Sequence, residues 1–206
     1  MSTTKSNIHR SPVGRLVYPH ILKPQRNEQD TKDVYSLSLN VPKDKDSKGK
    51  LRFPAKLKEM EDFLAETCRK KWGDSWSDDV ELPFRDGDSD KTLKKREYNH
   101  GCICIAMRSY DQQPGLGIIQ PNGSVRDAEP HELKDYFYAG ARVICSYNAY
   151  TFDTGKKRGV SVGLRTVVFV GHGEKLTVSA SASTDFDGVS MGDYAKELYE
   201  DAEDED

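Results

Sequence analysis

The sequence predicts a mainly β protein, a small closed or partly closed barrel of five or six strands with one inserted α-helix and long loops. Three observations predict this class. Apolar and polar residues alternate in several separate segments, a single segment shows a sustained helical period, and turn signals separate the strands. Hydrophobic residues make up 35% of the 206 residues, so we expect a modest core and long solvated stretches.

Two early strands are expected to pair as a hairpin. Residues 13–23 predict a strand that is bent at Pro19, because proline within a strand is tolerated at an edge or a bulge. Residues 34–41 alternate cleanly between apolar and polar side chains, as a half-buried strand does. The loop between the two segments is rich in turn-forming residues.

The one helix is expected over residues 54–72. Apolar residues recur there at three- and four-residue spacing, Pro54 fits the first turn, and Gly73 fits the stop. Residues 73–97 show no period, so we expect a long polar connection. Such a loop in a compact domain is usually functional or disordered.

Strand patterns return after residue 99. A turn at Pro121-Asn122-Gly123 and a second at Asp153-Thr154-Gly155 separate them, and the second turn predicts that the last two strands form a hairpin. The expected elements are strands over residues 102–110, 115–120, 140–152 and 159–170, and a short helical turn over 128–137.

Charge divides the chain into a basic body and an acidic end. From Asp185 onward one lysine stands against ten acidic residues, so that the charge is 1 − 10 = −9, and the preceding residues carry 30 − 24 = +6. We expect a flexible N-terminus over residues 1–12, a folded domain over 13–180 and a disordered acidic tail over 181–206. The tail either aids solubility or competes with a polyanion for the basic surface.

Several classes of protein are excluded or disfavoured. No apolar run approaches the roughly 18 residues of a membrane span, and the N-terminus lacks the apolar centre of a secretory signal. Four cysteines are too few for a disulfide scaffold, which favours a reducing compartment. Cys102-x-Cys104 lacks the spacing of zinc knuckles, so we expect buried thiols, no metal and no cofactor. Hydrolase and phosphate-loop motifs are missing, so we expect no enzyme.

Basic and aromatic residues are interleaved in the second half of the chain, which is typical of proteins that bind single-stranded nucleic acid. Cations hold phosphates, and flat side chains stack on bases for about 1–3 kcal/mol each. Each tyrosine alone could equally fill the core, so the interpretation depends on their concentration in one stretch. The residues expected to contact nucleic acid are Arg85, Lys91, Lys94, Arg96, Tyr98, Arg108, Tyr110, Arg142, Tyr147, Tyr150, Phe152 and Lys157, with Tyr110, Tyr147, Tyr150 and Phe152 as the stacking rings.

Strand alternation restricts which of these rings can act together. Tyr150 and Phe152 fall on one face of the strand, and Tyr147 falls on the opposite face. All three rings could line one groove only if a bulge near Asn148 reversed the alternation.

Five motifs together resemble the single-stranded DNA-binding proteins of tailed phages, in particular a prophage-type family. That family has an F/Y-AG strand, a D-T/N-G turn and a G-V-S-x-G-L return strand. In this chain the motifs span roughly residues 14–170 and are GRLVYPHILKP, YSLSLNVPKD, the helix end KKWG, LPFRDGD and YAGARVICSYNAYTFDTGKKRGVSVGLRTV.

The resemblance implies a five-stranded OB-fold-like barrel over residues 13–180. It also implies a homodimer that coats single-stranded DNA without sequence preference during replication, recombination and repair in the cytoplasm of the infected bacterial host. Replication proteins such as polymerase and helicase–primase would contact the tail. Known tails of this functional type end in an aromatic anchor, whereas this sequence ends in Asp206, so we expect charge to mediate recruitment. The tail residues concerned are Glu200, Asp201, Glu203, Asp204, Glu205 and Asp206.

Two other functions compete with DNA binding. The first is a protein-interaction module, such as a virion or regulatory adaptor, with a merely solubilising tail. The second is a nuclease built around Asp86, Asp88 and Asp90, which is disfavoured because these carboxylates lie in an aperiodic loop without a matching base.

Overall fold

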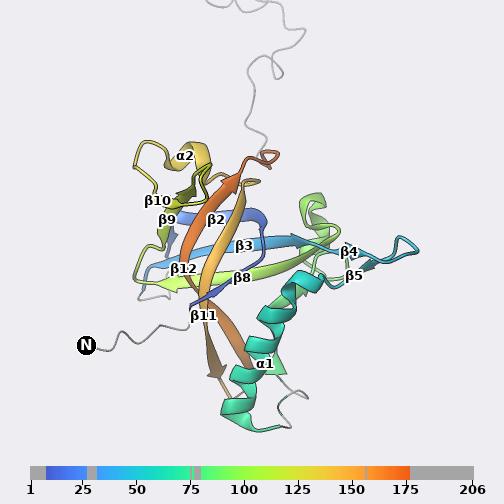
Figure 1. Cartoon of the computed structure of the whole chain (residues 1–206). Coiled ribbons are helices and arrows are strands. Elements are labelled where there is room, and N and C mark those ends of the chain that lie inside the picture. Colours follow the sequence, from blue (N-terminus) through green and yellow to red (C-terminus); the bar gives the residue numbers. More distant parts are fainter. Residues whose placement is uncertain (1–7, 27–31, 75, 77–79, 156, 177–206) are drawn as a thin grey trace, which may run out of the picture. The chain divides into compact units, whose positions relative to one another are not determined.

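Five strands close into a ring in which each strand is hydrogen-bonded to two ring neighbours (Figure 1). The computed structural model describes residues 8–26, 32–74, 76, 80–155 and 157–176. In ring order the strands are β2 (Gly14–Gln25), β3 (Val34–Pro42), β8 (Cys102–Tyr110), β12 (Arg158–Gly171) and β11 (Arg142–Asp153), which pairs back onto β2. β8 and β12 run parallel, and the other four ring pairs run antiparallel. The ring confirms the predicted mainly β fold.

Inward-facing side chains from alternate strand positions form the core. Leu16, Leu39, Ile105 and Val143 are all 0% exposed and come from four different ring strands. Because the side-chain period of a strand is two residues, the intervening positions of the same strands point out of the ring. This alternation positions the outward face described below.

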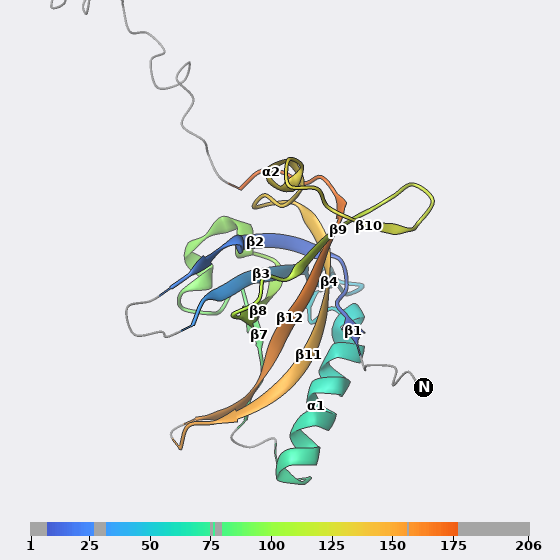
Figure 2. The ribbon, with the colours of Figure 1, turned by 90° about the vertical axis from the view of Figure 1, so that its left-hand side faces the viewer.

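The predicted helix forms and covers one part of the ring. A short 3₁₀ turn, η1 (Ala55–Leu57), leads into α1 (Lys58–Trp72), which ends at Gly73 with a positive φ of 80°. α1 runs beside β11 and β12 in both views (Figures 1 and 2). Its buried face consists of Met60, Leu64 and Cys68.

Shorter elements extend the ring at several places. β1 pairs with β11, β6 with β12, β7 with β8, and β9 with both β12 and β10, while β4 and β5 form a separate hairpin. These strands are β1 (His9–Arg10), β4 (Asp44–Lys45), β5 (Leu51–Arg52), β6 (Val80–Glu81), β7 (Phe84–Asp86), β9 (Gly115–Ile119) and β10 (Val125–Asp127). The remaining helical turns are η3 (Leu93–Lys95), η4 (Glu97–Asn99) and α2 (Leu133–Tyr136).

Two sequence predictions of irregular structure are wrong in part. Residues 1–12 were expected to be flexible, yet β1 pairs with Tyr147 and Ser146 of β11, and the Ser11 hydroxyl accepts a hydrogen bond from Cys145 N at 2.9 Å. The segment 73–97 was expected to lack regular structure, yet it contributes β6, β7 and η3. Strands of two or three residues carry no readable period, which explains both misses.

Other sequence predictions hold. The pairing of β2 with β3 is irregular between Val17 and His20, which confirms the bend expected at Pro19. All four cysteines are buried and free, as expected of thiols that pack as small hydrophobes. No helix in the described part of the chain is long and apolar enough to cross a membrane.

Candidate nucleic-acid interface

Small side chains form the floor of the outward ring face. Ser38 lies opposite Ala106 where β3 pairs with β8, and Arg108 of β8 is paired with both Ser36 and Gly163. A Cβ atom at Gly163 would lie 2.0 Å from Oδ1 of Asn148, so a larger residue there would displace the Asn148 side chain. This floor leaves room for flat ligand groups to approach the backbone of the sheet.

Three hollows above this floor adjoin one another, and we call them together the groove. Their volumes are about 300, 190 and 420 Å³, and Arg108 lines all three. Tyr18 and His20 line one end of the groove, and Asn148 and Arg165 line the other. The groove is therefore centred on one exposed arginine of β8.

Aromatic rings stand along the groove. Tyr110 is 44% exposed and Tyr150 is 37% exposed, and both line the same hollow. Phe152 and Tyr150 line the adjacent hollow from one face of β11. Burial raises the pKa of the Tyr150 phenol, and the neighbouring Tyr110 phenol raises this pKa further. A neutral ring can lie beside phosphates without repelling them.

A pair of tyrosines marks one end of the groove. The Tyr98 hydroxyl donates a hydrogen bond of 2.7 Å to the Tyr18 hydroxyl, and the two rings meet edge to face at 5.9 Å between centroids. Burial, followed by this hydrogen bond, raises the pKa of Tyr98 to about 12. Tyr18 has a positive φ of 50°, which is rare for a bulky residue and places its side chain at the interruption of β2. The sequence patterns point to Tyr98 but not to Tyr18, for which the bend at Pro19 is the available signal.

The cations along the groove differ in their existing partners. Arg108 forms no salt bridge with another described residue. Arg85 lines two of the hollows and pairs with Asp90 at 2.7 Å. Lys157, a predicted contact residue, lies outside the lining of the groove and pairs at 2.7 Å with Glu81, which lines one hollow. Arg165, which sequence analysis missed, is exposed and lines the hollow that contains Tyr110. Arg108 and Arg165 are thus the cations that a phosphate could approach without first displacing a carboxylate described here.

A basic segment, residues 91–98, lies beside the Tyr18 end of the groove. It presents Lys91, Lys94 and Arg96 to solvent, while Leu93 lines the groove. These three cations were expected to contact nucleic acid, and the structure brings their segment to the groove without placing the three side chains in its lining.

Two buried amides hold the basic segment against β3. Asn40 donates hydrogen bonds to Asn99 Oδ1 at 2.7 Å and to Tyr98 O at 3.3 Å, and Asn99 donates to Leu93 O at 2.9 Å. Both asparagines are 0% exposed, so their amides depend on these partners. The position of the segment is therefore coupled to the outward face of β3.

The carboxylates of the nuclease hypothesis are engaged in local structure. Lys43 Nζ lies 2.7 Å from carboxylate oxygens of both Asp86 and Asp88, and Asp90 accepts hydrogen bonds from the backbone of Thr92 and Leu93. Burial favours the neutral form of Asp86, but hydrogen bonds from Lys43 and from the backbone outweigh it and lower its pKa. Within the described residues no three His, Cys, Asp or Glu side chains gather as a metal site.

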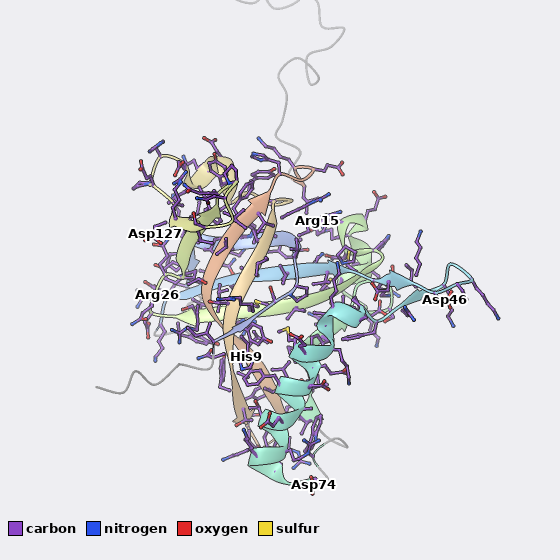
Figure 3. All side chains as sticks on the ribbon, viewed as in Figure 1. His9, Arg15, Arg26, Asp46, Asp74 and Asp127 are labelled. Atoms are coloured by element: carbon purple, nitrogen blue, oxygen red, sulfur yellow. The ribbon has the colours of Figure 1, made fainter. Side chains whose placement is uncertain are left out.

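Two predicted contact residues lie elsewhere. Tyr147 is 1% exposed and packs in the core near Phe63 and His9, which is labelled in Figure 3, so its assignment as a stacking ring is corrected. The predicted alternation holds, because the irregularity between Ser146 and Tyr147 places its extra residue on β12 and leaves β11 alternating. Arg142 lines a separate cavity that shares no lining residue with the groove.

The acidic tail positions lie outside the described residues.

Comparison with known proteins decides the family. The family model described as the single-stranded DNA-binding protein of Enterobacter phage Enc34 matches residues 8–201. The chain belongs to this family. The match confirms the resemblance to phage single-stranded DNA-binding proteins drawn from the motifs. None of the curated proteins compared with the chain matches it.

Solved structures of phage single-stranded DNA-binding proteins share the fold of this family member. The bacteriophage Enc34 protein in complex with single-stranded DNA has a TM-score of 0.65 and 21% identity, over 84% of this chain and 91% of that chain. Its C-terminal truncation has a TM-score of 0.63 and 20% identity, over 84% and 90%. Gp2.5 of bacteriophage T7 has a TM-score of 0.53 and 15% identity, over 89% and 94%. These likenesses confirm the predicted OB-fold class.

The ion pairs of Lys43 predict a loss of stability in acid. The pKa values of Asp86 and Asp88 lie below the ordinary value of 3.8, so their contribution to the free energy of unfolding is present above about pH 4 and is lost as the pH falls through the lowered pKa values. We expect Lys43→Met to lower the urea midpoint at pH 6 and the difference from the parent protein to shrink towards pH 2.

The matched control is Lys45→Met, which removes an exposed lysine from the β4–β5 hairpin. It should leave the midpoint nearly unchanged at both pH values. A Lys43→Met effect of equal size at pH 6 and pH 2 would show that packing, and not the carboxylate charges, accounts for the contribution of Lys43.

Proposed function

We propose that this family member binds single-stranded DNA in the groove and coats it without sequence preference during phage replication, recombination and repair. The observation that carries the proposal is the combination of a floor of small residues, flanking rings and an arginine at the centre. Bases can stack on Tyr110, Tyr150 and Phe152, while Arg108 holds the phosphates. Stacking tolerates every base because every base has a flat face.

The groove also gives a reason for preferring single strands. In duplex DNA the faces of the bases are stacked on one another and cannot reach Tyr110 or Tyr150, so only the phosphate contacts of Arg108 would remain. We propose that the protein acts without catalysis, since Asp86, Asp88 and Asp90 already hold the loop that precedes the basic segment. The expected homodimer and location in the host cytoplasm remain predictions.

Charge supports a role for the acidic tail. The segment from Asp185 onward carries −9 against +6 for the preceding residues, and both belong to one chain. A tethered polyanion has a high effective concentration near the basic body, so it competes with DNA until DNA displaces it. We propose that the displaced tail recruits replication proteins, such as polymerase or helicase–primase, through basic surfaces on those partners.

The stacking role of Tyr150 is testable with variants that separate the ring from the hydroxyl. Tyr150→Leu should weaken the binding of oligothymidine by about 1–3 kcal/mol, because it removes one stacking surface. Tyr150→Phe keeps the ring and should retain most of the affinity. Affinities can be measured by fluorescence anisotropy with a labelled oligothymidine over a range of salt concentrations.

Arg108→Gln distinguishes charge from stacking in the same assay. It should reduce the magnitude of the slope of log affinity against log salt by about 0.7, because one phosphate contact is lost, whereas Tyr150→Leu should leave the slope unchanged. Tyr147→Phe changes a buried tyrosine and serves as a control that should not affect binding. Equal affinity of the parent protein for duplex and single strands would contradict the proposal.

Removal of the acidic tail tests the competition model. A chain that lacks residues 185–206 should bind oligothymidine more tightly than the full chain, and the gain should be largest at low salt, where charge is least screened. A full-length variant with asparagine and glutamine in place of the tail acids controls for length and should behave like the truncation. Unchanged or weaker binding by both variants would remove the competition model.

A further inference from the structure

A second cationic cavity lies at the start of β11 and shares no lining residue with the groove. Its volume is about 540 Å³, larger than any of the three hollows of the groove. Its lining includes four cationic side chains, Arg15, Lys43, Lys56 and Arg142, and two carboxylates, Asp44 and Glu174. Figure 3 labels Arg15, which marks this end of β2. We call this site the Arg15–Arg142 cavity.

Two arginines occupy directly opposite positions on two of the strands that line this cavity. Arg15 and Arg142 are direct partners where β2 pairs with β11. Like charges at directly opposite positions of an antiparallel pair are destabilising. Backbone hydrogen bonds of 2.8 Å, from Leu16 N to Ala141 O and from Gly140 N to Leu16 O, hold the two strands together beside this pair. These hydrogen bonds keep the two arginines at opposite positions of the paired strands.

The acidic groups of the cavity form no salt bridge with either arginine. Neither arginine forms a salt bridge with another residue that the structure describes. The Asp44 carboxylate instead accepts a hydrogen bond of 2.6 Å from Ala55 N, and Glu174 is exposed. Lys43 is already paired with Asp86 and Asp88 at 2.7 Å each. Arg15, Arg142 and the exposed Lys56 thus remain to attract an anion.

The chain connects this cavity to the groove directly. Tyr18, which lines one end of the groove, is three residues from Arg15 along β2. At the rise of a β-strand this separation is at most about 10 Å. A strand of DNA that leaves the groove past Tyr18 therefore has only a short distance to cover before it reaches Arg15. Guanidinium groups suit phosphate oxygens in particular, because their planar donor arrangement can bind two oxygens at once.

We propose that the Arg15–Arg142 cavity is a second phosphate-binding site, which holds the backbone of the same DNA strand beyond the groove. The inference rests on the proposed function of the groove. Bases need not stack at this site, so it contributes charge contacts alone. The site extends the length of DNA that one protein molecule covers. Phosphates of a long strand would offset the like charges of Arg15 and Arg142, whereas a short strand would leave them unpaired.

The test uses the full chain with the double variant Arg15→Gln/Arg142→Gln and oligothymidines of about 4 to 20 nucleotides, which span the usual footprint of an OB fold. For the longest oligonucleotides the variant should show lower affinity and a salt slope smaller in magnitude by about 1.4, since two phosphate contacts are lost. The shortest oligonucleotides that fill the groove should bind the variant and the parent protein equally. The unliganded variant should show no decrease in the midpoint of thermal unfolding, because a repulsion is removed.

A control of equal charge is Lys71→Gln/Lys134→Gln, which removes two exposed lysines from α1 and α2. It should not alter the dependence on oligonucleotide length.

The inference is overturned if the arginine variant binds long strands as the parent does, if it loses affinity equally at all lengths, or if its unfolding midpoint falls. Tighter binding of long strands, with no further gain on removing residues 185–206, would instead assign the cavity to an acidic peptide. Failure of the parent protein to bind any oligothymidine would refute the proposed function itself.

Discussion

The division of each ring strand into an inward and an outward set of side chains is the constraint on which the site depends. Along β11 the inward set includes the buried Tyr147, and the outward set includes Tyr150 and Phe152 beside the groove. Because β11 is paired on both edges, its register cannot slip by one residue without exchanging these sets. Closure of the five-strand ring therefore fixes which aromatic side chains face the groove.

A second layer of structure supplies charge around this rigid face. The basic segment over residues 91–98 consists of short turns with few buried apolar residues of its own, and the amides of Asn40 and Asn99 secure it to β3. Asp86 and Asp88 tie the preceding loop to Lys43. These acidic residues thus have a structural use, because each offsets a specific cation or satisfies backbone N–H groups.

Local sequence patterns predict those parts of the molecule that local physics determines. The helical period of α1, the alternation of β3 and the strand patterns of β8, β11 and β12 were readable because each extends over nine residues or more. Arg165 could not be assigned to the groove, since an irregularity in strand pairing sets its position, and only the bend at Pro19 pointed towards Tyr18. Likewise, the separation of Arg142 from the other predicted contacts follows from the pairing of β11 with β2, which no local pattern encodes.

Photo-crosslinking with a bromodeoxyuridine-substituted single strand tests the central claim most directly, because the reaction requires contact between a base and a protein side chain. After digestion and mass spectrometry, we expect crosslinks to groove residues, foremost Tyr110, Tyr150 and Phe152, and none to the buried Tyr147. Crosslinks concentrated on α1 or α2, with the groove residues unmodified, would contradict it.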